Sequence, residues 1–182
     1  MALPSTIFRI EIDVSDVDRG TFLTEELRLA QHPSESTGYF LSRIFAWALE
    51  YDESLEIGRG IAHPDEPTLF VRDEMGNIAR WIEVGAPTAD RMHKITKQAA
   101  DVRVYTHRDI QTVLRELRSR PIHRAEDVKV FEFPQNVLKD VEERLERRAT
   151  WSLLRSDGVL YVTIGDDTFS GPLVEHRIVD ET

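Results

Sequence analysis

The sequence of 182 residues has no cysteine, and it has no uninterrupted apolar run of about 18 residues. The first absence excludes disulfides, thiolate catalysis and zinc or iron–sulfur sites with cysteine ligands. The second predicts that no helix spans a membrane. The N-terminus shows no basic region followed by an apolar run, so no signal peptide is expected. Together these absences predict a soluble, cytoplasmic protein without membrane contact.

Basic side chains are the minority, with 23 lysines and arginines against 33 acidic residues and a net charge of −10. This balance argues against a protein that simply coats nucleic acid or an anionic membrane. The basic residues are concentrated, because residues 90–124 hold nine of them with four acids, a net charge of +5, whereas the rest of the chain carries −15. We therefore expect this basic segment, residues 90–124, to form a phosphate-binding surface.

Polarity alternates with a period of two over residues 7–14 and again over 21–31, which predicts an N-terminal hairpin. A helix is expected from Ser34 to Leu49, because apolar residues recur there with helical spacing. Further strands are predicted at 55–60, 68–72, 78–84, 102–106 and 128–133. Helices are predicted at 88–100, 109–118 and 135–148. A C-terminal hairpin is predicted at 151–154 and 159–164, followed by an edge strand that reaches Val179. The chain shows no repeat and no long linker, so we expect one domain over residues 1–182, an α/β fold with a mixed sheet.

From residue 35 to residue 107 the predicted order is helix, three-strand meander, helix and strand. This order resembles the core of the PD-(D/E)XK, or restriction-endonuclease-like, nucleases, with hairpins added at both ends of the chain. The resemblance implies that the chemistry lies on the middle two strands. There, Pro64 and Asp65 precede one strand, and Glu83 lies near the end of the next.

A hairpin over residues 68–84 places Glu83 opposite Thr68, three residues from Asp65, which is about 10 Å along an extended chain. Two carboxylates near one strand end can hold a divalent cation such as Mg²⁺, or Mn²⁺ in its place, because hard cations take carboxylate and phosphate oxygens as ligands. Such an ion would polarise a phosphoryl oxygen and activate a water molecule. Since cysteine is absent, the predicted site is liganded by oxygen.

In the nuclease superfamily the backbone carbonyl after the glutamate is a further ligand, which corresponds to Val84 here. A lysine normally follows, but this chain has Gly85. Some members of the superfamily carry the lysine on the next helix, where this chain offers Arg91, Lys94 and Lys97. We expect Lys94, and after it Lys97, to stabilise phosphoryl charge, and Arg91 to contact the substrate. The alternative is that these side chains form only the solvated face of an amphipathic helix.

The segments His32–Glu35, Asp65–Pro67 and Trp81–Pro87 together resemble the YaeQ family, which is similar in fold to these nucleases. The resemblance extends over nearly the whole chain. It implies that Glu35 belongs with Asp65 and Glu83 around the candidate metal site. Glu35 is equally compatible with a purely structural role in the first turn of the helix, where a negative charge interacts favourably with the helix dipole.

Two classes of function are compatible with these residues. The first is a Mg²⁺-dependent phosphodiesterase that acts on nucleic acid or on a smaller, nucleotide-like phosphate ester, with Asp65 and Glu83 as metal ligands. The second is a non-catalytic, nuclease-like scaffold that binds a protein or nucleic-acid partner through the basic segment, and Gly85 favours this alternative. The sequence leaves the oligomeric state open, and a monomer is compatible with it.

Overall fold

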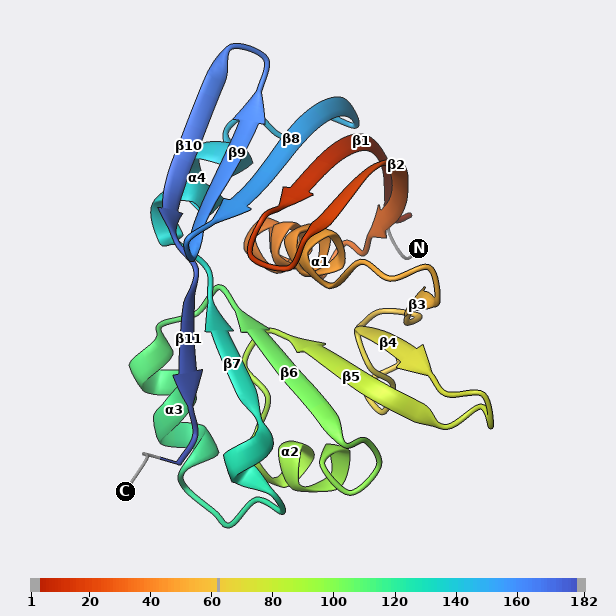
Figure 1. Cartoon of the computed structure of the whole chain (residues 1–182), viewed down its shortest axis with the longest axis vertical. Helices are drawn as coiled ribbons and strands as arrows, with labels where there is room; N and C mark the ends of the chain where they lie inside the picture. Colours follow the sequence, from red (N-terminus) through yellow and green to blue (C-terminus); the bar gives the residue numbers. More distant parts are fainter. Residues whose placement is uncertain (1–3, 62, 180–182) are drawn as a thin grey trace. The chain divides into compact units, whose positions relative to one another are not determined.

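The computed structural model describes residues 4–61 and 63–179, and the chain divides into two compact units (Figure 1). The first unit consists of Met1–Leu49 and Phe133–Leu173, and the second of Glu50–Glu132 and Val174–Thr182. Each unit is therefore built from two separate stretches of chain around its own β-sheet. Residues 1–3, part of the N-terminus for which no signal peptide is predicted, lie outside the described residues.

The sheet of the first unit has the strand order β10-β9-β8-β1-β2. Its strands are β1 (Thr6–Asp16), β2 (Thr21–Gln31), β8 (Arg148–Ser156), β9 (Val159–Ile164) and β10 (Asp167–Pro172). The hairpins predicted at the two ends of the chain are confirmed, as β1 with β2 and β8 with β9, both antiparallel. The two hairpins join into one sheet because β1 pairs with β8 in parallel, a long-range contact that the sequence pattern did not predict.

Apolar and polar residues alternate along β1, so one face of this sheet is buried. Phe8, Ile10, Ile12 and Val14 are all at most 6% exposed, whereas the residues between them point to solvent. Helix α1 (Thr37–Glu50) contributes to the same core through a buried stripe, and the rings of Phe8 and Phe40 lie 4.7 Å apart.

Two helix boundaries in this unit differ from the sequence prediction. Helix α1 begins at Thr37, three residues after the predicted start at Ser34, because the Ser36 hydroxyl caps it by accepting a hydrogen bond from the Tyr39 amide. Helix α4 (Gln135–Glu142) ends well before the predicted Arg148. Arg148 is instead the first residue of β8, where it pairs with Arg9, so tertiary pairing overrides a helical pattern of charges.

The sheet of the second unit has the order β11-β7-β6-β5-β4-β3. Its strands are β3 (Leu55–Ile57), β4 (Leu69–Arg72), β5 (Ile78–Val84), β6 (Asp101–Thr106), β7 (Lys129–Glu132) and β11 (Val174–Arg177). The first three form the predicted antiparallel meander, while β5, β6 and β7 run parallel. The predicted hairpin register is confirmed, since Leu69 pairs with Ile82 and Phe70 with Trp81.

Helices α2 (Ala89–Ile95) and α3 (Ile110–Leu117), with a short 3-10 turn at Ala125–Asp127, pack with one face of this sheet around a shared apolar cluster. The cluster takes Trp81 from β5, Met92 from α2 and Val104 from β6, each at most 2% exposed. The predicted start of a helix at Thr88 is confirmed, because its side chain caps α2 by accepting the Arg91 amide. Asp109, the predicted first residue of the next helix, caps α3 in the same way through the Thr112 amide. Helix α2 ends five residues before the predicted Ala100, at Ile95, where Thr96 closes it.

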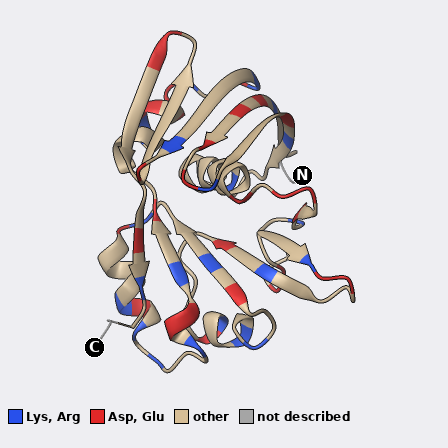
Figure 2. Cartoon of the chain, in the orientation of Figure 1, with Lys and Arg blue, Asp and Glu red and all other residues tan. Residues whose placement is uncertain are grey.

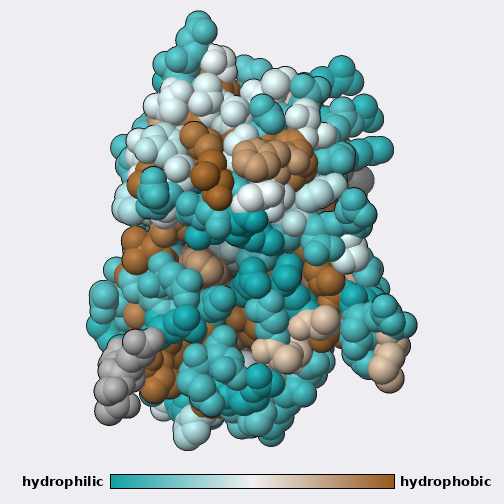
Figure 3. Space-filling view, in the orientation of Figure 1, coloured by the Kyte–Doolittle hydropathy of each residue, from teal (hydrophilic) through white to brown (hydrophobic). Residues whose placement is uncertain are grey.

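The predicted single C-terminal edge strand is two strands. Strand β10 lies at the edge of the first sheet and β11 at the edge of the second, with Leu173 between them. Exposed large hydrophobic side chains include Phe22 and Met75, and Figure 3 shows both hydrophobic and hydrophilic areas on the visible face. Within the described part of the chain, no helix is long and apolar enough to cross a membrane.

Candidate functional site

The two carboxylates expected at the site differ in their surroundings. Glu83 is the next-to-last residue of β5 and is 7% exposed, on the same face as Trp81. Asp65 is exposed, in the loop before β4, where it lines a cavity of about 350 Å³ together with Glu66, Pro67 and Trp81. The buried carboxylate is thus held by the sheet, and the exposed one by a loop.

Arg91, in the first turns of α2, connects these two places. Its Nε donates to Oε1 of Glu83 at 2.7 Å, and its Nη2 donates to Oε2 at 3.0 Å, which makes a bidentate pair. The same guanidinium donates to the carbonyl oxygens of Pro64 and Glu66, the latter at 3.1 Å. The loop that carries Asp65 is therefore tied to Glu83 through the Arg91 side chain.

Glu83 has a further partner that sequence reasoning missed. The indole Nε1 of Trp81 donates to Oε2 of Glu83 at 2.9 Å, and the ring is 2% exposed. A buried carboxylate is tolerated only when it is paired and hydrogen-bonded, and Arg91 with Trp81 satisfies both conditions. The signal was present in the sequence, since residues two apart on a strand share a face.

Carboxylate and carbonyl oxygens from separate segments converge on the Arg91 guanidinium. Oxygens of these types are the ligands that hard divalent cations prefer. The carboxylate and carbonyl oxygens of Glu83, Pro64, Asp65 and Glu66 are therefore chemically suitable ligands for Mg²⁺. Arg91 holds both oxygens of Glu83, and a cation would have to displace it to bind them. Among the described residues, no group of three or more histidine or acidic side chains is arranged around a common metal position.

The missing lysine after Glu83 has a local cause in the backbone. Gly85 has a φ of 107°, in the region that only glycine adopts without strain. Its amide donates to the Tyr105 carbonyl at 2.8 Å, which extends the pairing of β5 with β6. Val84, the expected carbonyl ligand, is buried, and its amide donates to the Thr68 hydroxyl at 3.2 Å. A lysine at position 85 would strain this turn.

The three basic candidates on and after α2 have different positions. Arg91 reaches Glu83, whereas the Lys94 and Lys97 side chains are exposed and form no ion pair with the described residues. Lys97 lies beyond the end of the helix at Ile95. The structure thus brings the candidate substrate ligand Arg91, rather than either candidate catalytic lysine, to the buried carboxylate.

Glu35 lies in the first unit and has its own partners there. Its carboxylate forms an ion pair with Arg43 at 2.7 Å, and the two side chains are 1% and 5% exposed. Its second oxygen accepts the His32 amide at 3.1 Å. Because α1 begins at Thr37, Glu35 precedes the helix and is not the first-turn acid that the structural alternative predicts.

The basic segment of residues 90–124 is largely neutralised by nearby acids. Arg103 pairs with Glu50 and Asp101, and Arg120 pairs with Asp90. Figure 2 accordingly shows basic and acidic residues mixed over these elements. Lys94, Lys97, Arg108 and Arg115 are among the basic side chains of the segment that form no ion pair with the described acids.

A second carboxylate beside Asp65 is also held by an arginine. The Nε of Arg59 donates to both oxygens of Glu66, at 2.8 Å and 3.0 Å. This hydrogen bonding lowers the pKa of Glu66 to about 2, so the carboxylate stays charged across the physiological range. Sequence reasoning missed this pair, because Arg59 and Glu66 lie in irregular segments where no periodicity relates them.

Over residues 4–61 and 63–179, the arrangement defines an α/β protein with two mixed sheets and four α-helices, and with a buried carboxylate-arginine cluster at the end of a central strand. The family described as YaeQ protein matches residues 1–171. The chain therefore belongs to the YaeQ family.

Relatives of known sequence and structure agree with this assignment. The uncharacterized protein YaeQ of Escherichia coli (strain K12) is 33% identical over 165 residues, which cover 90% of this chain and 91% of that protein. The crystal structure of YaeQ from Pseudomonas syringae superimposes with a TM-score of 0.84 at 26% identity and covers 99% of both chains. That from Xanthomonas axonopodis pv. citri gives a TM-score of 0.84 at 28% identity, over 96% of this chain and 98% of that one.

Proposed function

We propose that this protein is a divalent-cation-dependent phosphodiesterase with a restriction-endonuclease-like core. The order α1, β3, β4, β5, α2, β6, with β5 and β6 parallel, supports that core. The observation that carries the function is the set of oxygens around Arg91. Carboxylate oxygens of Glu83 and main-chain oxygens of the Asp65 loop converge on one positive charge, which is the environment that a divalent cation requires.

In this proposal Arg91 holds the site closed in the resting protein. Asp65 and Glu83 supply the carboxylate ligands, and the resemblance adds the Val84 carbonyl of the same unit. A bound cation would polarise a phosphoryl oxygen and lower the pKa of the attacking water. Arg91, once released from Glu83, contacts the phosphate of nucleic acid or of a nucleotide-like ester, and Lys94 or Lys97 stabilises the developing charge.

Calorimetry with Mn²⁺, together with hydrolysis of bis(p-nitrophenyl) phosphate and of single- and double-stranded DNA, tests the proposal. Wild type binds Mn²⁺ at millimolar concentration, and Asp65→Asn and Glu83→Gln each lower affinity and hydrolysis about tenfold or more. The exposed hairpin residue Glu74 provides the matched control, because Glu74→Gln removes a carboxylate from the same unit outside the site. Wild type without Mn²⁺ binding, or variants equal to wild type, would overturn the proposal.

A second candidate function is favoured by one specific observation. Arg91 donates to both oxygens of Glu83 while Gly85 replaces the lysine, as expected for a nuclease-like scaffold that binds a partner without catalysis. Lys94→Glu with Lys97→Glu then abolishes binding of a 20-nucleotide oligo(dT), whereas Glu83→Gln leaves it intact. Equal loss in both variants, or no oligo(dT) binding by wild type, would contradict the scaffold function with this probe.

A further inference from the structure

Three arginines lie side by side on the exposed face of the sheet of the first unit. Arg9 of β1 is directly opposite Arg28 of β2 and also directly opposite Arg148 of β8. All three are exposed, on the face opposite the apolar core. With strands about 4.8 Å apart, the row spans about 10 Å at the backbone. We call these residues the arginine row.

The arginine row is unfavourable for the sheet itself. Like charges directly opposite each other on neighbouring strands destabilise the pairing by a few tenths of a kcal/mol to about 1 kcal/mol. None of the three guanidinium groups has an ion pair with any described residue. The neighbouring row repeats the pattern with the other sign, because Glu11 is opposite Glu26. The sheet therefore groups these charges by sign instead of placing opposite charges directly across from each other.

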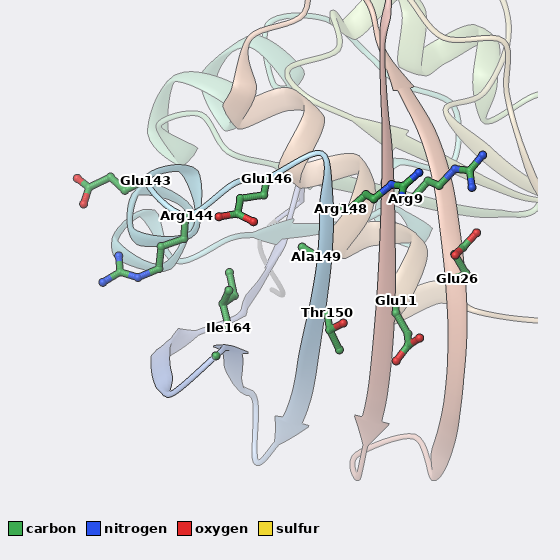
Figure 4. Close-up of a pocket in the computed structure, with 11 residues that line it drawn as sticks. Arg9, Glu11, Glu26, Glu143, Arg144, Glu146, Arg148, Ala149, Thr150 and Ile164 are labelled. Atoms are coloured by element: carbon green, nitrogen blue, oxygen red, sulfur yellow. The ribbon is translucent and has the colours of Figure 1, made fainter.

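A cavity lies over two members of the arginine row, Arg9 and Arg148, whereas Arg28 is not one of its lining residues. It has a volume of about 680 Å³, and its lining also includes Glu11, Glu26 and Thr150. Figure 4 shows the Arg9 and Arg148 side chains next to one another, with their guanidinium groups extended in the same direction. This volume lies within the range of pockets that bind small molecules. The cavity thus offers adjacent guanidinium groups to a ligand of small-molecule size.

The charges around the row restrict the ligand. Glu11 and Glu26 lie about 7 Å from the arginines along the strands, and Glu143 and Glu146 line the cavity as well. A long polyanion crossing this face would meet these carboxylates, whereas a compact anion fits within the row. Guanidinium groups bind phosphate oxygens through paired, charge-assisted hydrogen bonds. Several adjacent arginines therefore suit a ligand with several adjacent phosphates.

We propose that the arginine row of Arg28, Arg9 and Arg148 is a binding site for a compact polyphosphate, such as the triphosphate group of a nucleotide. This site belongs to the first unit and is independent of the Glu83 cluster in the second. The Thr150 hydroxyl, two residues along β8 from Arg148, supplies a neutral hydrogen-bond donor beside the row.

Calorimetry at low salt with inorganic tripolyphosphate, orthophosphate and 20-nucleotide oligo(dT) tests the site in the full-length chain. Tripolyphosphate binds more tightly than orthophosphate, and Arg9→Gln weakens it about tenfold or more, because it removes the central member of the row. Glu11→Gln has the opposite effect and tightens binding several-fold, since it removes a neighbouring negative charge.

The matched control is Arg147→Gln, which removes an exposed arginine adjacent in sequence but outside the row. It changes tripolyphosphate affinity less than twofold. Arg9→Gln does not lower the thermal midpoint, because relieving like-charge repulsion favours the sheet, so its loss of binding is not a loss of folding. Equal losses from Arg147→Gln and Arg9→Gln, no binding of tripolyphosphate by wild type, or binding of oligo(dT) alone would each overturn the proposal.

Discussion

Arg91 and Glu83 form a bidentate ion pair, with distances of 2.7 Å and 3.0 Å between nitrogen and oxygen, at the end of β5. The same guanidinium also donates to the Glu66 carbonyl at 3.1 Å. One side chain therefore fixes a helix, a strand and a loop in relation to each other. It also neutralises the buried carboxylate at which the proposed cation would bind. The Arg91–Glu83 pair therefore stabilises the folded protein but competes with cation binding.

Replacing Arg91 by methionine tests the stabilising role of the pair. The variant leaves Glu83 buried with Trp81 as its remaining hydrogen-bond donor, and breaking a buried pair by removing one partner costs about 3 kcal/mol. Urea unfolding of Arg91→Met measures the change in the free energy of unfolding. The exposed Lys94 on the same helix is the control, and Lys94→Met is expected to change stability by less than about 0.5 kcal/mol. Equal effects of the two variants would contradict the prediction.

The same substitution separates the resting pair from the cation site. Without the guanidinium, a divalent cation no longer competes with Arg91 for the Glu83 oxygens, so we expect Arg91→Met to bind Mn²⁺ more tightly than wild type. Arg91→Lys retains a positive charge but lacks the planar fork, and it should fall between the two. Calorimetry measures the three affinities, and weaker Mn²⁺ binding by Arg91→Met than by wild type would exclude a competing role for Arg91.

Local patterns predicted much of this structure because they report burial. The β4-β5 register followed from the loop at residues 74–77 and the alternation around it. The start of α2 followed from the capping chemistry of the Thr88 side chain. The pairing of β1 with β8 was not predictable in this way, because it depends on contacts between residues about 140 positions apart. The two-sheet division of the chain follows from that pairing.

The candidate site shows the same division between local and long-range information. The position of Glu83 near a strand end was predictable from periodicity, and the Asp65 loop from its prolines. That Arg91 contacts Glu83 while Lys94 is exposed depends on which side of α2 faces the end of β5, and this tertiary placement is not specified by the residue pattern. Gly85 was identified as a departure from the motif, but its cause, a positive φ, is visible only in the backbone.

Glu35 and Arg43 form the most completely buried ion pair in the first unit, and their side chains are 1% and 5% exposed. Glu35→Gln and Arg43→Met each leave the other group without its charge partner, so each should destabilise the protein by about 3 kcal/mol. In a double-mutant cycle the two effects are expected to be strongly non-additive. Urea unfolding measures the coupling, and additive effects would contradict a direct pair.

The Arg43 pair also predicts the outcome of the metal experiment for Glu35. Because both oxygens of Glu35 already accept hydrogen bonds within its own unit, Glu35→Gln should leave Mn²⁺ affinity unchanged while it lowers stability. A loss of Mn²⁺ affinity as large as that of Glu83→Gln would instead assign Glu35 to the cation site, as the family resemblance implies.

His107 gives the protein a specific dependence on pH. Burial and the nearby charge of Arg108 lower the pKa of His107 to about 4, from an unfolded value near 6.5. The unfolded chain therefore binds a proton in a range where the folded chain does not, and stability is lost as the pH falls from about 6.5 to about 4. Partial exposure of the ring reduces the expected loss to about 1–2 kcal/mol.

Comparison of wild type with His107→Gln isolates this contribution from the carboxylates that also titrate in acid. Urea unfolding at pH 7, 5.5 and 4.5 should show a smaller loss of stability for the variant. His123, which lies in an exposed loop of the same unit, provides the control, and His123→Gln should follow the wild-type profile. Parallel profiles for wild type and His107→Gln would refute the assignment.

Gly58 controls the position of the loop that carries Asp65. A Cβ at this residue would lie 2.0 Å from the Pro67 carbonyl oxygen, a backbone atom that cannot turn aside as a side chain would. The Gly58 amide also donates to the Thr68 carbonyl at 2.9 Å, so the two segments cannot separate without losing that bond. Gly58→Ala should therefore destabilise the protein by about 1–3 kcal/mol and weaken Mn²⁺ binding as the loop shifts.

Gly76→Ala serves as the control for a loss of glycine, because its Cβ would meet open space although its φ of 84° imposes some strain. It should lower stability without changing Mn²⁺ affinity, and equal Mn²⁺ affinities for all three proteins would show that the loop does not position a cation ligand.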